Sequence, residues 1–124
     1  MSTTPGPDPN VTEILKRGNS CVFFDVTVSD VPLGRVKIEL YTSTVPKTCE
    51  NFRQFCTGEH LSNAQPVGYK GCLFHRVIKG FMIQGGDFIN GNGTGKTSIY
   101  DGVSFDDEDL SGKVSTYGVV RLLQ

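Results

Sequence analysis

Leu73-Phe74-His75-Arg76-Val77-Ile78-Lys79-Gly80-Phe81-Met82-Ile83-Gln84-Gly85-Gly86-Asp87-Phe88 is the stretch that decides the fold of this chain. Two short apolar runs flank a Lys-Gly turn, a pattern that predicts a β-hairpin. Side chains on a strand alternate between its two faces, so Phe74 and Arg76 share one face of the first strand. Met82 and Gln84 likewise share a face of the second strand. The hairpin thus gathers a guanidinium, a carboxamide and a thioether beside apolar groups, which is the usual composition of a small-ligand or peptide site.

Upstream of this stretch, the sequence predicts a second hairpin. Apolar and polar residues alternate in 22–28 and again in 36–40, as they do in half-buried strands. Residues 29–34 contain Asp-Val-Pro-Leu-Gly, a composition typical of a turn. We therefore expect the two runs to pair antiparallel, with one face in the core.

A helix is predicted after this second hairpin. Pro46 suits the first helical position, which needs no amide donor, and Gly58 is a natural C-terminal stop. Cys49, Phe52 and Cys56 recur on one side as an apolar stripe. We expect the helix to lie across one sheet face or over an open end of a barrel.

The remaining segments are interpreted mainly as loops. Residues 60–67 are polar and predict a surface loop in which His60 is solvated. A glycine-dense turn follows at 90–95, where the backbone can approach its neighbours closely, and 98–100 is expected to be extended. The acidic run 106–109 is interpreted as a solvated loop, with a cation site as the alternative; it lacks the spacing and the glycine of an EF-hand.

Two features suggest other chemistry. Residues 91–97 are similar to a phosphate-binding loop, but Asn90 stands where that motif needs its first glycine, and the residues that follow do not predict a long helix. His75 suggests a general base, yet alternation places it on the strand face opposite Arg76, and no nucleophile pairs with it by motif. We interpret His75 as a packed, hydrogen-bonded structural residue, and we do not expect nucleotide binding.

Length and composition limit the classes of function. The 124 residues fit one domain, and a net charge of −1 gives no reason to expect direct binding of nucleic acid or of a membrane surface. The apolar runs are far shorter than the ~20 residues that a bilayer span needs. The N-terminus lacks the apolar region of a signal peptide, so nothing there suggests secretion. The four cysteines lack the spacing of metal sites, so they predict free thiols in a reducing cytoplasmic or nuclear compartment. We expect no metal and no cofactor.

Several short motifs, taken in order along the chain, resemble those of the cyclophilins, the β-barrel peptidyl-prolyl isomerases. The similarity covers residues 22–110. Within the family, residues 53–59 and 66–71 are most similar to the form found with spliceosomal particles. The motifs are Val22-Phe23-Phe24-Asp25-Val26, Gly34-Arg35-Val36-Lys37-Ile38-Glu39-Leu40, Val45-Pro46-Lys47-Thr48, Glu50-Asn51-Phe52-Arg53, Gly68-Tyr69-Lys70-Gly71, Phe74-His75-Arg76-Val77-Ile78, Phe81-Met82-Ile83-Gln84-Gly85-Gly86-Asp87-Phe88 and Asn92-Gly93-Thr94-Gly95.

The resemblance implies a fold that is mainly β with one or two helices, built as an antiparallel barrel. It implies cis-trans isomerisation of X-Pro bonds in proline-containing peptides or proteins, inhibition by cyclosporin-type compounds, and spliceosomal proteins as partners. Arg76 matches the catalytic arginine of the family. Phe81 and Met82 match residues that hold the proline ring, Gln84 matches the amide that holds the substrate backbone, and Gly93 matches a position that lines the groove.

The likeness weakens after Leu110. A complete cyclophilin continues with Met-Ala-Asn, Gln-Phe-Phe and Trp-Leu segments, which close the barrel and form the other wall of the proline pocket, and these have no match here. We therefore expect a mobile extension at 1–20, an open or incomplete cyclophilin-like domain at 21–110, and a divergent tail at 111–124. The alternative to an active isomerase is a truncated, weakly catalytic or non-catalytic module that binds proline peptides or proteins in association with the spliceosome.

Overall fold

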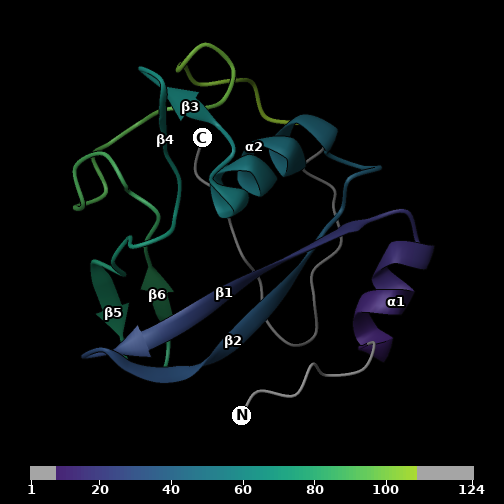
Figure 1. The fold of residues 1–124 in the computed structure, drawn as a ribbon, viewed down its shortest axis with the longest axis horizontal. Coiled ribbons are helices and arrows are strands. Elements are labelled where there is room, and N and C mark those ends of the chain that lie inside the picture. The colour runs from purple at the N-terminus through teal and green to yellow at the C-terminus, as the bar shows by residue number, and fades with distance from the viewer. Residues whose placement is uncertain (1–7, 109–124) are drawn as a thin grey trace.

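A computed structural model describes residues 8–108 of the chain (Figure 1). Its strands pair as three separate two-stranded antiparallel sheets, which within the described residues do not close into a barrel. The prediction of a mainly β fold with one or two helices and an incomplete or open barrel is therefore confirmed, and the helices are two within the described residues. The elements are α1 (Pro9–Lys16), β1 (Ser20–Val28), β2 (Val31–Leu40), α2 (Pro46–Thr57), β3 (Leu61–Ser62), β4 (Gln65–Pro66), β5 (Arg76–Ile78) and β6 (Met82–Gln84).

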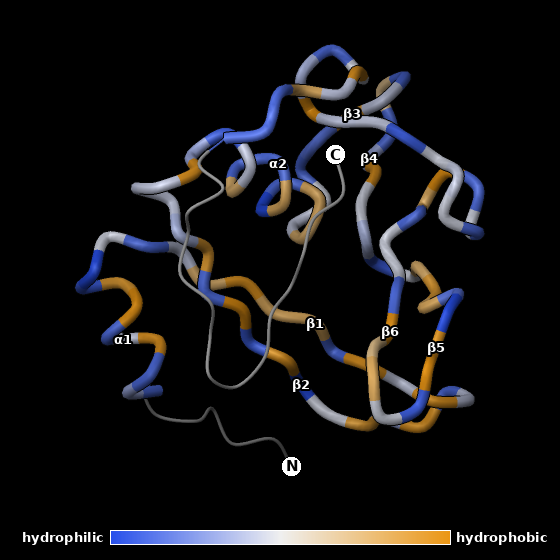
Figure 2. Tube along the Cα trace, turned by 180° about the vertical axis from the view of Figure 1, so that it is seen from behind, coloured by the Kyte–Doolittle hydropathy of each residue, from blue (hydrophilic) through white to orange (hydrophobic). Residues whose placement is uncertain are grey.

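The β1–β2 hairpin has the predicted antiparallel pairing. Val22 lies opposite Ile38, and a register shift follows Val26, where a bulge increases the local twist. The connection is shorter than the predicted six-residue turn. Ser29 and Asp30 both have positive φ, at 50° and 65°, as a two-residue hairpin turn requires. Apolar positions recur along both strands (Figure 2).

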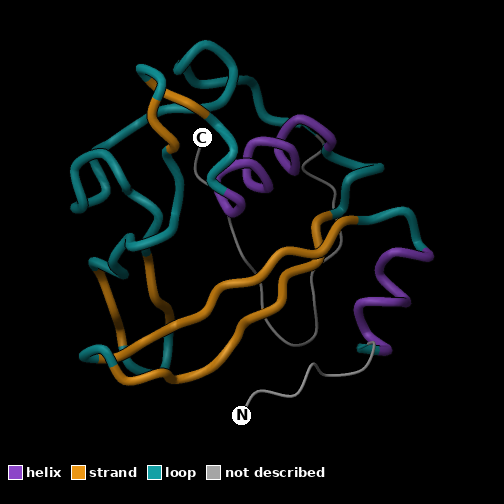
Figure 3. The backbone as a smooth tube through the Cα atoms, viewed as in Figure 1, coloured by secondary structure: helices purple, strands orange, loops and turns teal. Residues whose placement is uncertain are grey.

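Helix α2 begins and ends at the predicted residues and packs on β1 (Figure 3). Gly58 follows it at φ 75°, in the left-handed conformation that glycine adopts without strain. The core forms where α2 meets the hairpin, and burying one phenyl side chain there contributes about 1.5–3 kcal/mol. Its buried members are Val22, Ile38, Leu40, Cys49 and Phe52, with Phe24, Val45, Cys56 and Tyr69 packed against them.

The N-terminus of α2 is capped by a residue far along the chain. The Glu108 carboxylate accepts the backbone amides of Lys47 at 3.2 Å and Thr48 at 2.5 Å. The Tyr100 hydroxyl donates to the Lys47 carbonyl at 2.9 Å. Because Val45 provides no side-chain cap, Glu108 satisfies amides that the helix leaves without a partner. These contacts hold the segment that follows residue 98 against α2.

Helix α1 differs from the predicted mobile extension at 1–20. Asp8 caps it by accepting the Asn10 amide at 2.8 Å, and Ile14 is buried. Arg17 and Glu39 form a two-bond ion pair that ties the end of the helix to β2. The Arg17–Glu39 pair joins residues 22 positions apart, so local sequence patterns did not reveal it. Residues 1–7, and the tail predicted at 111–124, lie outside the described residues.

Two loop predictions need correction. The expected loop at 60–67 contains the β3–β4 pair, joined by Asn63 and Ala64, which both have positive φ. The segment expected to be extended at 98–100 leads into a turn instead. Ser98 is buried, and its hydroxyl accepts the Tyr100 amide at 3.0 Å, which folds the backbone back on itself.

Candidate functional site

The predicted hairpin of the central stretch is confirmed as β5–β6. Arg76 pairs with Gln84, and Ile78 pairs with Met82. Since directly paired residues project from the same face of a sheet, the guanidinium, the carboxamide and the thioether share one face. Each strand is only three residues long, so Phe74 precedes β5 and the predicted alternation does not extend to it. Along the long axis of the molecule, this hairpin lies toward the opposite end from α1 (Figure 1).

Arg76 presents its guanidinium at the surface. Its side chain is exposed and makes no hydrogen bond or ion pair with any residue from 8 to 108. Met82 and Gln84 are half-buried. Phe81 sits in the turn, and 79% of its surface is exposed. The hairpin therefore offers a fork of donors beside a thioether and an amide, while Phe81 extends from its end.

Gly93 lies close to this hairpin and belongs to the glycine-rich loop, residues 89–95. Its φ is 92°, and a Cβ built on it would lie 3.0 Å from Nε2 of His75 and 3.6 Å from Nε2 of Gln84. A Cβ there would make a tight contact with the His75 ring, and a φ of 92° is one that residues with side chains rarely adopt, so glycine suits this close approach of the loop backbone. The structure thus brings Gln84 and Gly93 together, two of the residues that the sequence placed in one site.

Asp87 holds the glycine-rich loop in place, a role that the sequence analysis missed. Its Oδ1 accepts the amides of Ile89 at 3.0 Å and Asn90 at 2.8 Å. Its Oδ2 accepts the amides of Asn92 at 3.2 Å, Gly93 at 2.8 Å and Gly95 at 3.0 Å. The available signal was an aspartate before a run of Asn and Gly, where short carboxylates bond to local backbone.

The charge state of Asp87 follows from these bonds. The amides of Asn90 and Gly95, followed by those of Gly93 and Asn92, hold the pKa of this carboxyl group well below its usual range. Hydrogen bonds to the charged form favour that form. Asp87 is therefore a carboxylate under any condition in which the domain would normally be studied.

The two histidines differ from their predicted surroundings. His75 is half-buried, but within residues 8–108 its buried Nδ1 has no hydrogen-bond partner. The interpretation of a packed residue stands, whereas the expected hydrogen bond is not present in the described part. His60 is half-buried rather than solvated, and its ring meets that of Phe55 edge-on at 5.7 Å.

An aromatic cluster connects the site to the core. Tyr69 contacts Phe52 at 5.3 Å between ring centroids and Phe88 at 6.0 Å, and burial raises the pKa of its hydroxyl. The Tyr69 amide also donates to the Phe55 carbonyl at 2.9 Å. Because Phe88 follows Asp87 directly, these ring contacts fix the base of the glycine-rich loop relative to α2.

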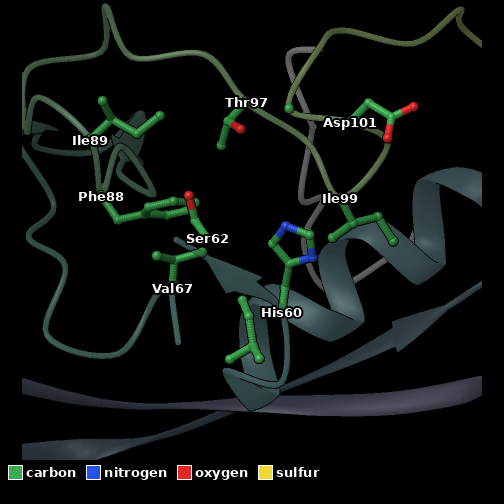
Figure 4. A pocket seen from close by; sticks show the side chains of 10 residues that line it. His60, Ser62, Val67, Phe88, Ile89, Thr97, Ile99 and Asp101 are labelled. Carbon is green, nitrogen blue, oxygen red and sulfur yellow. The ribbon is translucent and has the colours of Figure 1, made fainter. Parts of the chain in front are cut away.

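Two clefts lie away from the β5–β6 face. One, of about 490 Å³, is lined by His60, Ser62, Phe88 and Asp101 among others (Figure 4). The other cleft, of about 400 Å³, runs along Lys70 and Phe88. Neither is lined by the predicted site residues.

The described residues hold no cluster of three or more His, Cys, Asp or Glu side chains that could bind a metal ion. All four cysteines are free, and none is fully exposed, as predicted. Burial raises the pKa of Cys56 to about 12, and that of Cys49 is also raised. These thiols are therefore poor nucleophiles at neutral pH.

Comparison with known proteins decides the family. The family model for cyclophilin type peptidyl-prolyl cis-trans isomerase matches residues 23–122. This chain belongs to the cyclophilin family. It is 56% identical over 101 residues to peptidyl-prolyl cis-trans isomerase H of Rhizopus delemar, covering 82% of this chain and 57% of the relative. It is 51% identical over 104 residues to peptidyl-prolyl cis-trans isomerase CYP22 of Arabidopsis thaliana, covering 84% of this chain and 52% of that protein.

This cyclophilin chain therefore spans about half the length of the curated relatives that it matches. The confirmed similarity includes the whole β5–β6 hairpin and the glycine-rich loop. Across residues 8–108, neither helix has the length and apolar character needed to cross a bilayer.

Proposed function

We propose that this chain is a peptidyl-prolyl cis-trans isomerase that accelerates rotation about X-Pro bonds in protein substrates and so assists their folding. The observation that carries the proposal is the pairing of Arg76 with Gln84 on one face of β5–β6, with the guanidinium exposed and without an acidic partner among residues 8–108. Membership of the cyclophilin family supports it.

The chemistry needs no covalent intermediate. Rotation about the peptide bond has a barrier of ~18–20 kcal/mol because resonance gives the C–N bond partial double-bond character. Catalysis requires only that the twisted state be bound more tightly than either planar state. When the amide twists, the proline nitrogen gains a lone pair. The fork of donors on Arg76 can stabilise this lone pair while the substrate backbone is held nearby.

The other site residues have roles in binding. Met82 and Phe81 would contact the proline ring, and the Gln84 amide would bond to the substrate backbone. Gly93 would line the groove beside Gln84, where the absence of a side chain leaves room for the main chain of a peptide. The half-buried positions of Met82 and Gln84 support these assignments, because such side chains are held by packing yet remain accessible.

We also propose the cellular setting. The setting is the cytoplasm or nucleus, with spliceosomal proteins among the partners, and its support is the resemblance of residues 53–59 and 66–71 to the family form found with spliceosomal particles. Family membership supports inhibition by cyclosporin-type compounds.

A second function has a specific observation in its favour. Phe81 is 79% exposed, so no facing wall covers this ring within the described residues. A groove with one wall binds a proline ring weakly and holds the twisted state poorly. The second candidate is therefore a weakly catalytic or non-catalytic module that binds proline peptides or proteins.

The test is the substitution Arg76→Ala in the full chain, assayed on a tetrapeptide with a single X-Pro bond. We expect kcat/KM to fall about 100-fold, because electrostatic stabilisation of the twisted state is lost. The control is Lys79→Ala, which removes a nearby exposed cation from the turn and should leave turnover unchanged. Thermal unfolding should be the same for all three proteins.

The outcomes separate the two functions. Turnover that Arg76→Ala abolishes and cyclosporin inhibits supports the isomerase. Peptide binding with no turnover by the unsubstituted chain supports the binding module. Turnover that persists in Arg76→Ala would remove this residue from its catalytic role.

A further inference from the structure

Asp87 joins the two parts of the candidate site, the β5–β6 hairpin and the glycine-rich loop. It lies three residues after Gln84, the C-terminal residue of β6, and its carboxylate accepts the Gly93 amide at 2.8 Å. One side chain therefore connects the strand that carries the backbone-binding amide to the loop that passes over it.

The other bonds of the loop do not make this connection. The Asn90 side chain donates to the Thr94 hydroxyl at 3.0 Å, and the Asn92 carboxamide accepts the Thr94 amide at 3.1 Å. These bonds shape the loop internally. Among the described side chains, only that of Asp87 accepts hydrogen bonds from the amides on both sides of the loop tip, at Asn92 and at Gly95.

The position of Gly93 depends on this anchor. A Cβ at Gly93 would already meet His75 Nε2 at 3.0 Å and Gln84 Nε2 at 3.6 Å, so a loop that moved inward would contact the amide directly. A loop that moved outward would leave Gln84 free to turn. Binding is sensitive to such changes, since displacements of about 1 Å at positioning contacts are enough to weaken a site.

We propose that Asp87 is a positioning residue for the isomerase site, holding Gly93 against Gln84 so that the groove accepts an extended peptide backbone. This inference rests on the proposed function. Asp87 does not face the substrate itself, because its two carboxylate oxygens are occupied by five backbone amides. Its effect should therefore appear in substrate binding rather than in the rotation step.

The test compares Asp87→Asn with the unsubstituted full chain on the X-Pro tetrapeptide. A carboxamide of the same shape replaces one anionic acceptor by a donor, so the loop amides lose charge-assisted bonds. We expect KM to rise about tenfold while kcat changes less than about threefold. A purely structural role would instead lower the active fraction, which reduces apparent kcat and leaves KM unchanged. Asp106→Asn, at an exposed loop position, is the matched control and should change neither constant.

A second variant displaces the Asp87 carboxylate without changing Asp87 itself. A Cβ built on Gly95 would lie 2.2 Å from Oδ1 of Asp87, so Gly95→Ala should push the carboxylate out of the loop and reproduce the rise in KM. Nuclear magnetic resonance of both variants should show shifted amide signals for residues 89–95 and unchanged signals in β1 and β2.

The possible results are distinct. A raised KM with shifted loop amides supports the inference. Unchanged KM in Asp87→Asn, with normal activity of the unsubstituted chain, overturns it and leaves the proposed function intact. Global unfolding of both variants would show that Asp87 supports the fold as a whole, and would also overturn it. An unsubstituted chain that neither binds nor turns over the peptide removes the proposed function, and this inference with it.

Discussion

Gly68 lies where the segment after β4 meets the end of α2. A Cβ at this position would lie 2.3 Å from the carbonyl oxygen of Phe55, which also accepts the Tyr69 amide. The Phe55 carbonyl oxygen and the Tyr69 amide nitrogen both belong to the backbone, so neither can move without displacing a helix or the segment that follows β4. The position therefore excludes every side chain, although its φ is not in the left-handed region.

We predict that Gly68→Ala lowers the free energy of unfolding by about 2–4 kcal/mol, the range expected for severe overpacking of a well-packed site. Urea denaturation followed by far-ultraviolet circular dichroism measures it. Gly58→Ala provides the comparison, because Gly58 has open space around it but a φ of 75°, and its loss should cost only about 1 kcal/mol. Equal effects of the two substitutions would contradict the packing argument.

The sequence predicted that Met82 and Gln84 share a face and that Arg76 lies close by on the adjacent strand, because strand alternation is a local rule. That all three share one face became clear from the pairing of β5 with β6. The sequence did not predict the role of Asp87. That role depends on the backbone of residues 89–95, in which Gly91 and Gly93 adopt positive φ. No periodic pattern encodes where such a loop turns, so the acceptor of five amides was not apparent before the structure.

At the scale of elements, α2 carries a network of charges on its solvent side. Arg53 donates to Glu50 at 2.6 Å and to Glu59 at 2.5 Å. The bond from Arg53, followed by that from Gln54, lowers the pKa of Glu50 to about 2. The network ties the last turn of the helix to the residues that follow it.

This network predicts a specific pH dependence. Because the pKa of Glu50 is lower in the folded state than in the unfolded chain, its stabilisation is fully present above about pH 4.5 and is lost as the pH falls toward about 2. The side chain of Glu50 is 42% exposed, so the effect should be less than about 1 kcal/mol.

The measurement is the urea midpoint at pH 7 and at pH 3, compared between the unsubstituted chain and Glu50→Gln. The difference between the two proteins should shrink at the lower pH, while Asp106→Asn should behave as the unsubstituted chain does at both. A difference that stays constant between pH 7 and pH 3 would argue against the assigned ion pair.

The elements that the sequence predicted well are those with local signals. The alternation of β1 and β2, the Pro46 start and Gly58 stop of α2, and the Lys-Gly turn of β5–β6 are all visible within a few residues. Helix α1 is the exception. Its position depends on Asp8 bonding to Lys37 and Arg17 bonding to Glu39, and those partners are distant in sequence.

For the whole molecule, apolar surface is distributed unevenly. The buried core lies between α2 and the β1–β2 hairpin. By contrast, Val77 and Ile83 of the β5–β6 hairpin are 66% and 56% exposed, and Leu33 near the tip of β2 is 71% exposed. Few buried contacts therefore hold the β5–β6 hairpin, even though it carries the candidate site.

We predict that amide hydrogen exchange follows this division. The amides of α2 and of β1 near Val22 should exchange only on global unfolding, whereas those of β5 and β6 should exchange faster by local opening. Nuclear magnetic resonance of the full chain gives the rates residue by residue. Equal protection in both regions would mean that other contacts stabilise the hairpin, and rapid exchange throughout would mean that the chain does not fold alone.

The bond from Glu108 to the first turn of α2 has a consequence for synthesis on the ribosome. The capping carboxylate is synthesised about sixty residues after the amides whose hydrogen bonds it accepts. It cannot cap the helix until it has left the exit tunnel. Until then, those amides can donate hydrogen bonds only to water, and the first turn of a newly made α2 frays. Codon changes that slow translation just before residue 108 would prolong this interval and give a protease longer access to the nascent helix.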